Sequence, residues 1–161
     1  MSVIVVAVSL SRNTMIEEEL TGQIIKIFYK VYNELGHGFL ESIYQNAFII
    51  ELANSGIAAE SEKRIVVYYS GKPVGVFAAD LIVEGKIIIE LKAKETLHPA
   101  HEAQLVNYLR ATDIEVGLLF NFGKKPEFKR KFFSNGNKLR DGSEAETSIL
   151  EGLFEYPRES A

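Results

Sequence analysis

The most informative absence from this sequence is cysteine. None of the 161 residues is a cysteine, which excludes disulfide bonds, zinc–thiolate sites and iron–sulfur clusters. This composition fits a reducing compartment, and we expect a cytoplasmic protein. Histidine is also scarce, with three residues, of which His98 and His101 stand one helical turn apart. Because no third ligand stands at a matching spacing, the sequence does not favour a zinc site.

Other familiar signatures are missing too. The sequence has no Gly-x-Ser-x-Gly elbow and no glycine-rich phosphate loop ahead of a helix. No apolar run approaches the roughly 20 residues that cross a bilayer, so we expect no membrane partner. The formal net charge of −4 argues against a generally basic surface, although a local basic groove can still bind phosphate. Residues 1–14 start apolar without a positively charged leader, which favours an N-terminal extension or an extra strand over a secretory signal.

Hydrophobic spacing predicts one α/β domain over residues 15–133. Helical periodicity indicates helices at 14–34, 40–54 and 97–111, and β-rich runs indicate strands at 60–69, 74–83, 86–93, 115–122 and, at an edge, 128–133. The order α-α-β-β-β-α-β places a helix between the third and fourth strands, so we expect that pair to be parallel. The expected fold is a mixed sheet of at least four strands flanked by helices.

Two further expectations concern burial and the C-terminus. In the helix at 40–54, the side chains predicted to be buried are Ile43, Ala47, Ile50 and Leu52. Residues 134–161 are rich in Gly, Ser, Asn and Glu, and they are predicted to form a tail in which 149–154 could dock as a short helix.

The sharpest functional signal lies in a predicted hairpin at 76–94. Two apolar runs flank a turn at 84–85, and set into them are Asp80 and a Glu-Leu-Lys triplet from Glu90 to Lys92. Charged side chains within a sheet are seldom buried unless they pair or bind something. Glu90 and Lys92 are two apart on a strand, so they share a face.

The length of the turn decides whether Asp80 joins that face. A two-residue turn would place Asp80 opposite Ile89, on the wrong face. A three-residue turn, or a bulge that restores the parity, would place it opposite Glu90, with Cβ atoms roughly 4.5–5.5 Å apart. A site for one cation between the two carboxylates therefore predicts an odd-length turn.

Two adjacent carboxylates repel each other, and a hard divalent cation relieves that repulsion. Oxygen ligation suits Mg²⁺ or Mn²⁺, which can deprotonate water and stabilise charge on a phosphate. Lys92 beside the cation would polarise the attacking water or neutralise the transition state. The competing interpretation is an exposed hairpin face that carries a Glu–Lys ion pair and binds nothing.

Two polar pairs on helices are candidates to join this site. Glu41 and Tyr44 share a face near the start of the second helix, and Gln104 and Tyr108 are one turn apart on the helix after the hairpin. The N-terminal half of a helix that follows a strand commonly lies near the carboxyl end of that strand, where ligands bind. Each pair is also compatible with an ordinary solvated or half-buried helix face.

A basic and aromatic segment follows at 122–133. Its cations include Lys124, Lys125, Lys129 and Arg130, interleaved with phenylalanines. Such a segment can hold a phosphate backbone or stack a base. It can equally be an edge strand that its lysines protect from aggregation.

The order of these motifs resembles a known family. The motifs are Gly38-x-x-Glu41-x-x-Tyr44, then Asp80, Glu90-x-Lys92 and Gln104-x-x-x-Tyr108. They resemble the GxxExxY family of the PD-(D/E)xK nuclease superfamily over about residues 15–133, with Ala79 where many members have proline. The resemblance implies a restriction-endonuclease-like core.

The resemblance also implies a metal-dependent nuclease that acts on DNA or RNA. Asp80 and Glu90 resemble the paired metal ligands, Glu41 resembles the helical glutamate that completes the metal site, and Lys92 resembles the catalytic lysine. The implied cofactor is Mg²⁺ or Mn²⁺. The alternative is a non-catalytic module on the same fold that binds nucleic acid or protein.

Gln104 and Tyr108 are similar to the Gln-x-x-x-Tyr of RecB-type members, which implies that they position the phosphate, and Gln104 is counted with the catalytic residues. The predicted substrate-binding set contains Tyr108 and Tyr44, together with the four cations Lys124, Lys125, Lys129 and Arg130 of the basic segment. The oligomeric state is left open, a homo-oligomer included.

Overall fold

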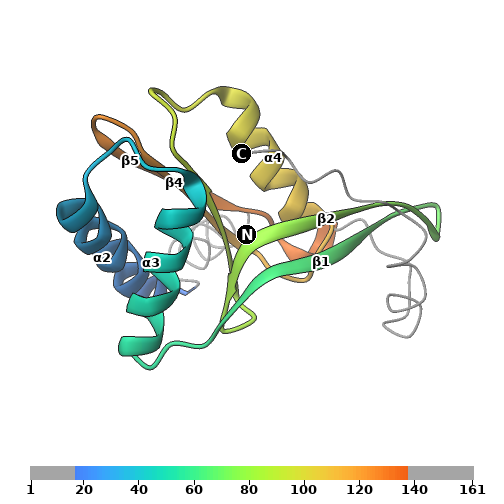
Figure 1. The fold of residues 1–161 in the computed structure, drawn as a ribbon. Coiled ribbons are helices and arrows are strands. Elements are labelled where there is room, and N and C mark those ends of the chain that lie inside the picture. The colour runs from blue at the N-terminus through green and yellow to red at the C-terminus, as the bar shows by residue number, and fades with distance from the viewer. Residues whose placement is uncertain (1–16, 138–161) are drawn as a thin grey trace, which may run out of the picture.

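The backbone of residues 17–137, the part that the computed structural model describes, is a five-stranded mixed sheet with helices on both faces (Figure 1). The elements in chain order are α2 (Glu18–Leu35), α3 (Glu41–Asn54), β1 (Ala59–Tyr69), β2 (Lys72–Val83), β3 (Ile87–Lys92), α4 (Pro99–Arg110), β4 (Val116–Phe122), β5 (Pro126–Phe132) and a 3-10 turn, Asn135–Asn137. This confirms the predicted order of elements. The predicted extension at 1–14 and most of the predicted tail lie outside the described residues.

The sheet has the strand order β1-β2-β3-β4-β5. Strands β1, β2 and β3 form an antiparallel meander, β3 and β4 are parallel, and β4 and β5 are antiparallel. Helix α4 is the crossover that the parallel pair requires. Every residue of β4 is buried, as expected for a central strand with both faces covered, and β5 takes the edge position predicted for it.

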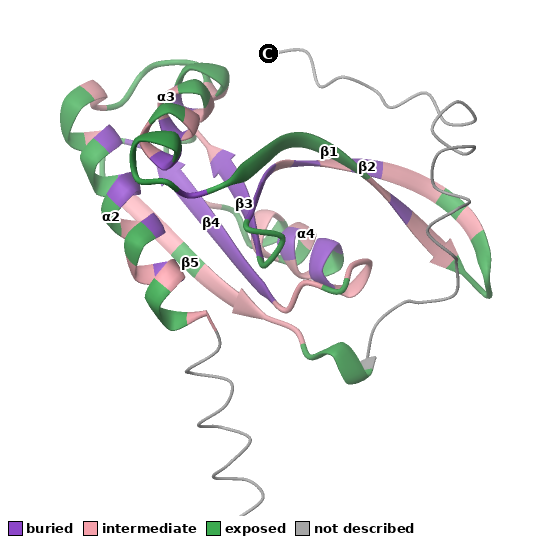
Figure 2. Ribbon diagram, turned by 90° about the horizontal axis from the view of Figure 1, so that it is seen from below, coloured by how far each residue is buried: buried purple, intermediate pink, exposed green. Residues whose placement is uncertain are grey.

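Two hydrophobic cores lie on the two faces of the sheet (Figure 2). Helices α2 and α3 pack on one face, where β3 contributes Ile87, Ile89 and Leu91. Helix α4 packs on the other face, where β3 contributes Ile88. Because side chains alternate along a strand, Glu90, two residues after Ile88, lies on the α4 side of the sheet.

The buried face of α3 differs from the predicted one. Tyr44, Phe48 and Leu52 are buried, whereas Ile43 is 38% exposed and Ile50 is 59% exposed. The buried residues stand four apart, so they form one stripe in which the aromatic rings fill the space against the sheet. Because α3 is apolar on more than one side, its spacing alone did not identify the face that packs.

The β1–β2 hairpin extends well beyond the rest of the sheet. Strand β2 pairs with β3 only from Leu81 to Val83, whereas β1 and β2 stay paired out to Tyr69 and Lys72. Residues 63–79 therefore form a two-stranded projection, here called the arm, which leaves the body of the protein in Figure 1. No helix within residues 17–137 is long and apolar enough to span a bilayer.

Candidate active site

Asp80 and Glu90 meet where strands β2 and β3 separate. The register pairs Val83 with Ile87 across a three-residue turn, which confirms the odd-length turn. Beyond Leu81 and Ile89, backbone amides bond to the Asp80 and Glu90 carboxylates instead of to backbone carbonyls of the neighbouring strand. The Asp80 amide donates to Glu90 Oε1 at 3.2 Å, and the Leu91 amide donates to Asp80 Oδ2 at 2.8 Å.

Two successive residues with positive φ make this turn feasible. Glu84 and Gly85 have φ values of 52° and 64°, in the left-handed region that glycine adopts without steric cost. The Lys86 amide closes the turn by donating to the Val83 carbonyl at 2.9 Å. The sequence thus sets the parity that brings both carboxylates to one face.

The two carboxylates differ in exposure, because Glu90 is buried and Asp80 is half-buried. Glu90 is 5% exposed. Burial raises the pKa of Asp80 to about 6, and burial together with the Asp80 charge raises the pKa of Glu90 well above its ordinary value. Because Glu90 is buried, the exposed-face interpretation of this hairpin is wrong for that residue. Two carboxyl groups this close repel each other when both are ionised, so a proton or another cation would stabilise the pair.

Lys92 lies at the half-buried end of β3, on the same face as Glu90. Its positive charge lowers the pKa of both carboxyl groups, although burial outweighs that effect. Asn121, which pairs with Lys92 on β4, is 1% exposed and holds the backbone of Lys94. The Asn121 side chain accepts from the Lys94 amide and donates to the Lys94 carbonyl, both at 2.9 Å. Asn121 was not predicted, although a polar residue in an apolar strand is the kind of signal that could have identified it.

Glu41 begins α3 and reaches the end of β3. Its Oε1 accepts from the Ala93 amide at 3.4 Å. Within residues 17–137, however, no three acidic or histidine side chains converge closely enough to hold a metal ion. The predicted triad is therefore only partly assembled, because Asp80 and Glu90 are in contact and Glu41 stays beside the backbone of Ala93.

Gln45, one turn after Glu41, links α3 to the carboxylate pair. Its Nε2 donates to Glu62 Oε1 at 3.0 Å and to the Asp80 carbonyl at 3.1 Å. Glu62 lies across from Asp80 on β1, has a φ of 54°, and raises the pKa of Asp80 through its charge. Neither residue was predicted, since only the tertiary packing brings α3 to this point of the sheet. The spacing of Gln45 four residues after Glu41 is the one signal available in the sequence.

Tyr44 does not lie where a substrate could reach it. Its side chain is fully buried and its ring stacks on Phe122, with centroids 4.1 Å apart and planes 12° apart. The hydroxyl donates to the Gly36 carbonyl at 2.8 Å and accepts from the Phe39 amide at 3.2 Å. The structure therefore gives Tyr44 a packing role, and its substrate contact stays a prediction. Tyr44 instead fixes the loop that leads into α3 and so positions the helix that carries Glu41.

Gln104 and Tyr108 do come together on α4. Gln104 Nε2 donates to the Tyr108 hydroxyl at 2.6 Å. The Tyr108 ring, 8% exposed, stacks on Phe77 at the base of the arm, with centroids 3.9 Å apart and planes 5° apart. Tyr108 therefore orients the Gln104 amide and joins α4 to the arm.

The start of α4 lies beside the end of β3. His98 Nδ1 accepts from the Ala100 amide at 3.1 Å, and His101 Nδ1 accepts from the His98 amide at 3.2 Å, so the two imidazoles form a reciprocal cap. Burial and then the charge of Lys92 lower the pKa of His101. This electrostatic effect of Lys92 agrees with the expected approach of the helix to the carboxyl end of the strand.

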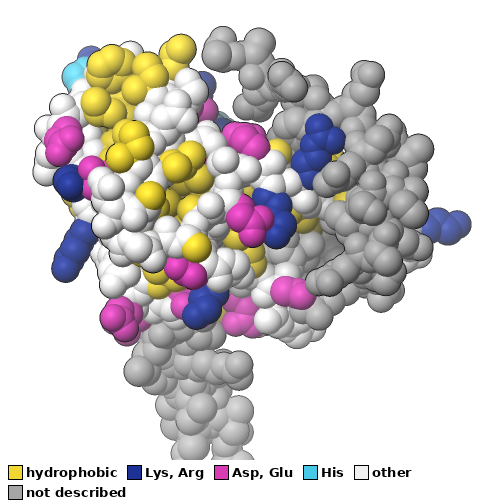
Figure 3. Space-filling model, turned by 60° about the horizontal axis from the view of Figure 1, so that its bottom comes forward, with side chains coloured by type: hydrophobic (Ala, Val, Ile, Leu, Met, Phe, Trp, Pro, Cys, Tyr) yellow, Lys and Arg dark blue, Asp and Glu magenta, His cyan; other side chains and the backbone are white. Residues whose placement is uncertain are grey.

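The basic segment at 124–131 lies on and before the edge strand β5. Lys124 and Lys125 are exposed, whereas Lys129 approaches Glu127 at 3.9 Å and Lys131 approaches Glu102 at 2.6 Å. Figure 3 shows acidic and basic side chains interspersed over one face of the protein. The substrate-binding role of Lys124, Lys125, Lys129 and Arg130 stays a prediction.

The chain is similar to chains of solved structures. No curated protein matches it. Three chains of solved structures match it. One, entitled "Crystal structure of SSO0001", is 24% identical, with 87% of this chain and 66% of that chain covered and a TM-score of 0.44. The present chain thus spans about 66% of the length of that chain.

A protein-family model gives the clearest relationship. The model of the PD-(D/E)XK nuclease superfamily matches residues 18–131, which is more than half of the chain. The five-stranded mixed sheet flanked by helices is consistent with the restriction-endonuclease-like fold. The protein belongs to the PD-(D/E)XK nuclease superfamily.

Proposed function

We propose that the protein is a divalent-metal-dependent nuclease that hydrolyses phosphodiester bonds of DNA, and that within its superfamily it belongs to the GxxExxY family. The observation that carries this proposal is the carboxyl pair of Asp80 and Glu90. Glu90 is buried and Asp80 is half-buried at a fork between two strands, and Lys92 follows Glu90 on the same strand face. A buried pair of this kind destabilises the fold, so it points to a function that needs both groups.

The donor chemistry fits Mg²⁺ or Mn²⁺. Asp80 and Glu90 supply oxygen ligands only, and Glu41 is the third candidate because its carboxylate lies at Ala93, just after Lys92. A divalent cation between the two carboxyl groups would offset the repulsion between their negative charges. A bound divalent ion would lower the pKa of water and neutralise charge on the phosphate.

The protein's own groups have distinct tasks in this proposal. Backbone amides hold one oxygen of each carboxylate, which keeps Asp80 and Glu90 at fixed orientations. The Lys92 ammonium group would offset negative charge that builds up on the phosphate during attack by water. The Gln104 amide, oriented by Tyr108, would hydrogen-bond to a phosphate oxygen and position the strand.

Nuclease assays on single- and double-stranded DNA, with RNA in parallel, test the proposal. We expect cleavage with Mg²⁺ or Mn²⁺ and none with EDTA. Glu90→Gln and Lys92→Ala should each lower the rate by about 10²–10³-fold. The matched control is Lys26→Ala, which removes an exposed lysine of α2 and should leave the rate unchanged. Cleavage that survives in both site variants would contradict the assignment, and metal-independent binding without cleavage would favour a non-catalytic module.

A further inference from the structure

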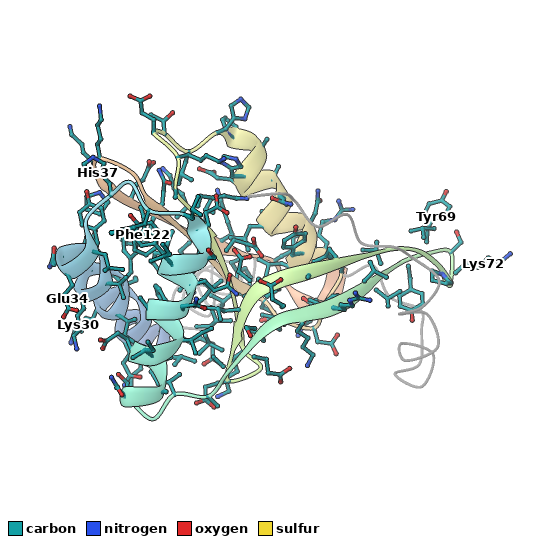
Figure 4. The ribbon with its side chains drawn as sticks, in the orientation of Figure 1. Lys30, Glu34, His37, Tyr69, Lys72 and Phe122 are labelled. Atoms are coloured by element: carbon teal, nitrogen blue, oxygen red, sulfur yellow. The ribbon has the colours of Figure 1, made fainter. Side chains whose placement is uncertain are left out.

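The arm, residues 63–79, is the part of the fold that the proposed active site does not use. Its two strands pair with each other from Lys63 and Ala79 out to Tyr69 and Lys72. At its tip Tyr69 is 72% exposed and Val74 is 55% exposed. Figure 4 shows Tyr69 and Lys72 at the end farthest from the helices α2 and α3. A long two-stranded projection with exposed aromatic and apolar side chains is suited to insertion into a partner.

The charge of the arm differs from that of the whole chain. Between Glu62 and Asp80 the sequence contains three cations, Lys63, Arg64 and Lys72, and no acidic residue, although the formal net charge of the protein is −4. Lys63 contacts Glu60 at 3.1 Å, at the base. Lys72, at the tip, is exposed and makes no ion pair with any residue of the described part of the chain. The free end of the arm is therefore a positive and aromatic surface.

The base of the arm is fixed relative to the carboxyl pair. Asp80 itself lies where β2 leaves β3, so the arm begins at the proposed catalytic centre. Phe77 stacks on Tyr108 of α4 and belongs to the second hydrophobic core. The packing of Phe77 on Tyr108 therefore fixes the direction of the arm. A partner bound at Asp80 could extend along the arm.

We propose that the arm binds nucleic acid on one side of the scissile phosphate, with Lys72 against the phosphate backbone and Tyr69 at the groove or a base. The proposal rests on the proposed nuclease function for its choice of partner. A two-stranded ribbon fits the major groove of a duplex, and a cation that has no acidic partner within residues 17–137 matches a polyanion. Lys72 stands eight residues before Asp80, so at a rise of about 3.3 Å per residue it reaches at most about 26 Å from the carboxyl pair. That reach corresponds to about eight base pairs at roughly 3.4 Å each.

The test measures binding separately from cleavage. Fluorescence anisotropy in EDTA, with a duplex of about 20 base pairs, compares the wild type with Lys72→Ala, Tyr69→Ser and the matched control Lys26→Ala. We expect Lys72→Ala to weaken binding about five-fold or more and to lower the slope of log K against log salt by about one. Tyr69→Ser should weaken binding as well, and Lys26→Ala should bind as the wild type does. Thermal melting of each variant checks that the fold is retained.

Three outcomes separate this proposal from the nuclease proposal. If Lys72→Ala and Lys26→Ala bind equally well, the arm proposal is overturned even where the wild type cleaves DNA. If the wild type cleaves nothing but still depends on Lys72 for binding, the arm proposal stands without the nuclease function. Loss of a dimer in Lys72→Ala, measured by light scattering with unchanged DNA binding, would assign the arm to contacts between copies and overturn the proposal.

Discussion

Removal of the charge on Asp80 should stabilise the protein when no divalent ion is present. Burial raises the pKa of Asp80 from 3.8 to about 6, a difference of roughly two units. At about 1.36 kcal/mol per unit, the ionised carboxylate costs the folded state about 3 kcal/mol at neutral pH. Asparagine has nearly the same shape and keeps an oxygen that can accept the Leu91 amide. We therefore expect Asp80→Asn to raise the free energy of unfolding at pH 7.5 by up to about 3 kcal/mol, and Tm by roughly 6–12 °C.

The sign of the pH dependence follows from the direction of the shift. A carboxyl group whose pKa is higher in the folded state binds more protons when folded, between pH 4 and pH 6 for Asp80. The wild type should therefore lose stability as the pH rises through this window. Glu90 shifts in the same direction and extends the loss to higher pH. The advantage of Asp80→Asn should be small at pH 4.5 and complete at pH 7.5.

Urea and thermal denaturation in EDTA at pH 4.5, 6 and 7.5 measure this effect. The control Glu34→Gln removes an exposed carboxylate and should change stability by less than about 0.5 kcal/mol. Mn²⁺ should then raise the Tm of the wild type but not of Asp80→Asn, because a ligand bound only to the folded state stabilises it. An Asp80→Asn protein that is no more stable than the wild type at pH 7.5, or an advantage that does not vary with pH, would refute the reasoning.

Three further substitutions test the supporting structure. Tyr44→Phe removes the two hydrogen bonds of the buried hydroxyl and should lower the free energy of unfolding, measured by urea denaturation, by about 1–2 kcal/mol. The KM for DNA should stay unchanged, and a raised KM would support the predicted substrate contact. Asn121→Ala leaves the Lys94 amide and carbonyl without their side-chain partner, so the free energy of unfolding should fall by about 1–3 kcal/mol and the cleavage rate should fall as well. An unaltered cleavage rate would show that activity does not need these two hydrogen bonds. Gly117→Ala would place a Cβ 2.7 Å from Leu105 Cδ1, where α4 crosses β4, and should lower the free energy of unfolding by about 1–3 kcal/mol. An unchanged midpoint of urea denaturation would mean that the Leu105 side chain moves aside without cost.

Local patterns in the sequence were sufficient for the element order. The parity of the central hairpin needed one further assumption, that Asp80 and Glu90 share a cation site. With that assumption, the alternation of side chains along each strand predicted an odd-length turn, and Val83 does pair with Ile87 across three residues. The parallel pairing of β3 and β4 followed in the same way from the helix between them.

Contacts between distant elements were beyond the reach of that reasoning. Gln45 donates to the Glu62 carboxylate and to the Asp80 carbonyl because α3 crosses the sheet at this position, and no spacing rule describes where a helix crosses. Tyr44 was assigned to substrate because it follows Glu41 on the helix, whereas its ring is large enough to fill the core against Phe122. In both cases the packing of α3 decided the role, and the apolar surface of α3 concealed which face would pack.

The fork between β2 and β3 has a thermodynamic consequence. Asp80 directly follows the arm on β2, whereas Glu90 belongs to β3, which pairs with β4 along its whole length. Only three residue pairs join β2 to β3 before the fork. A cation held by both carboxylates would tie the arm to the sheet, and nucleic acid held by the arm would in turn restrict the position of Asp80. If the two ligands bind in these places, their affinities must be linked. The factor by which nucleic acid strengthens cation binding must then equal the factor by which the cation strengthens nucleic-acid binding.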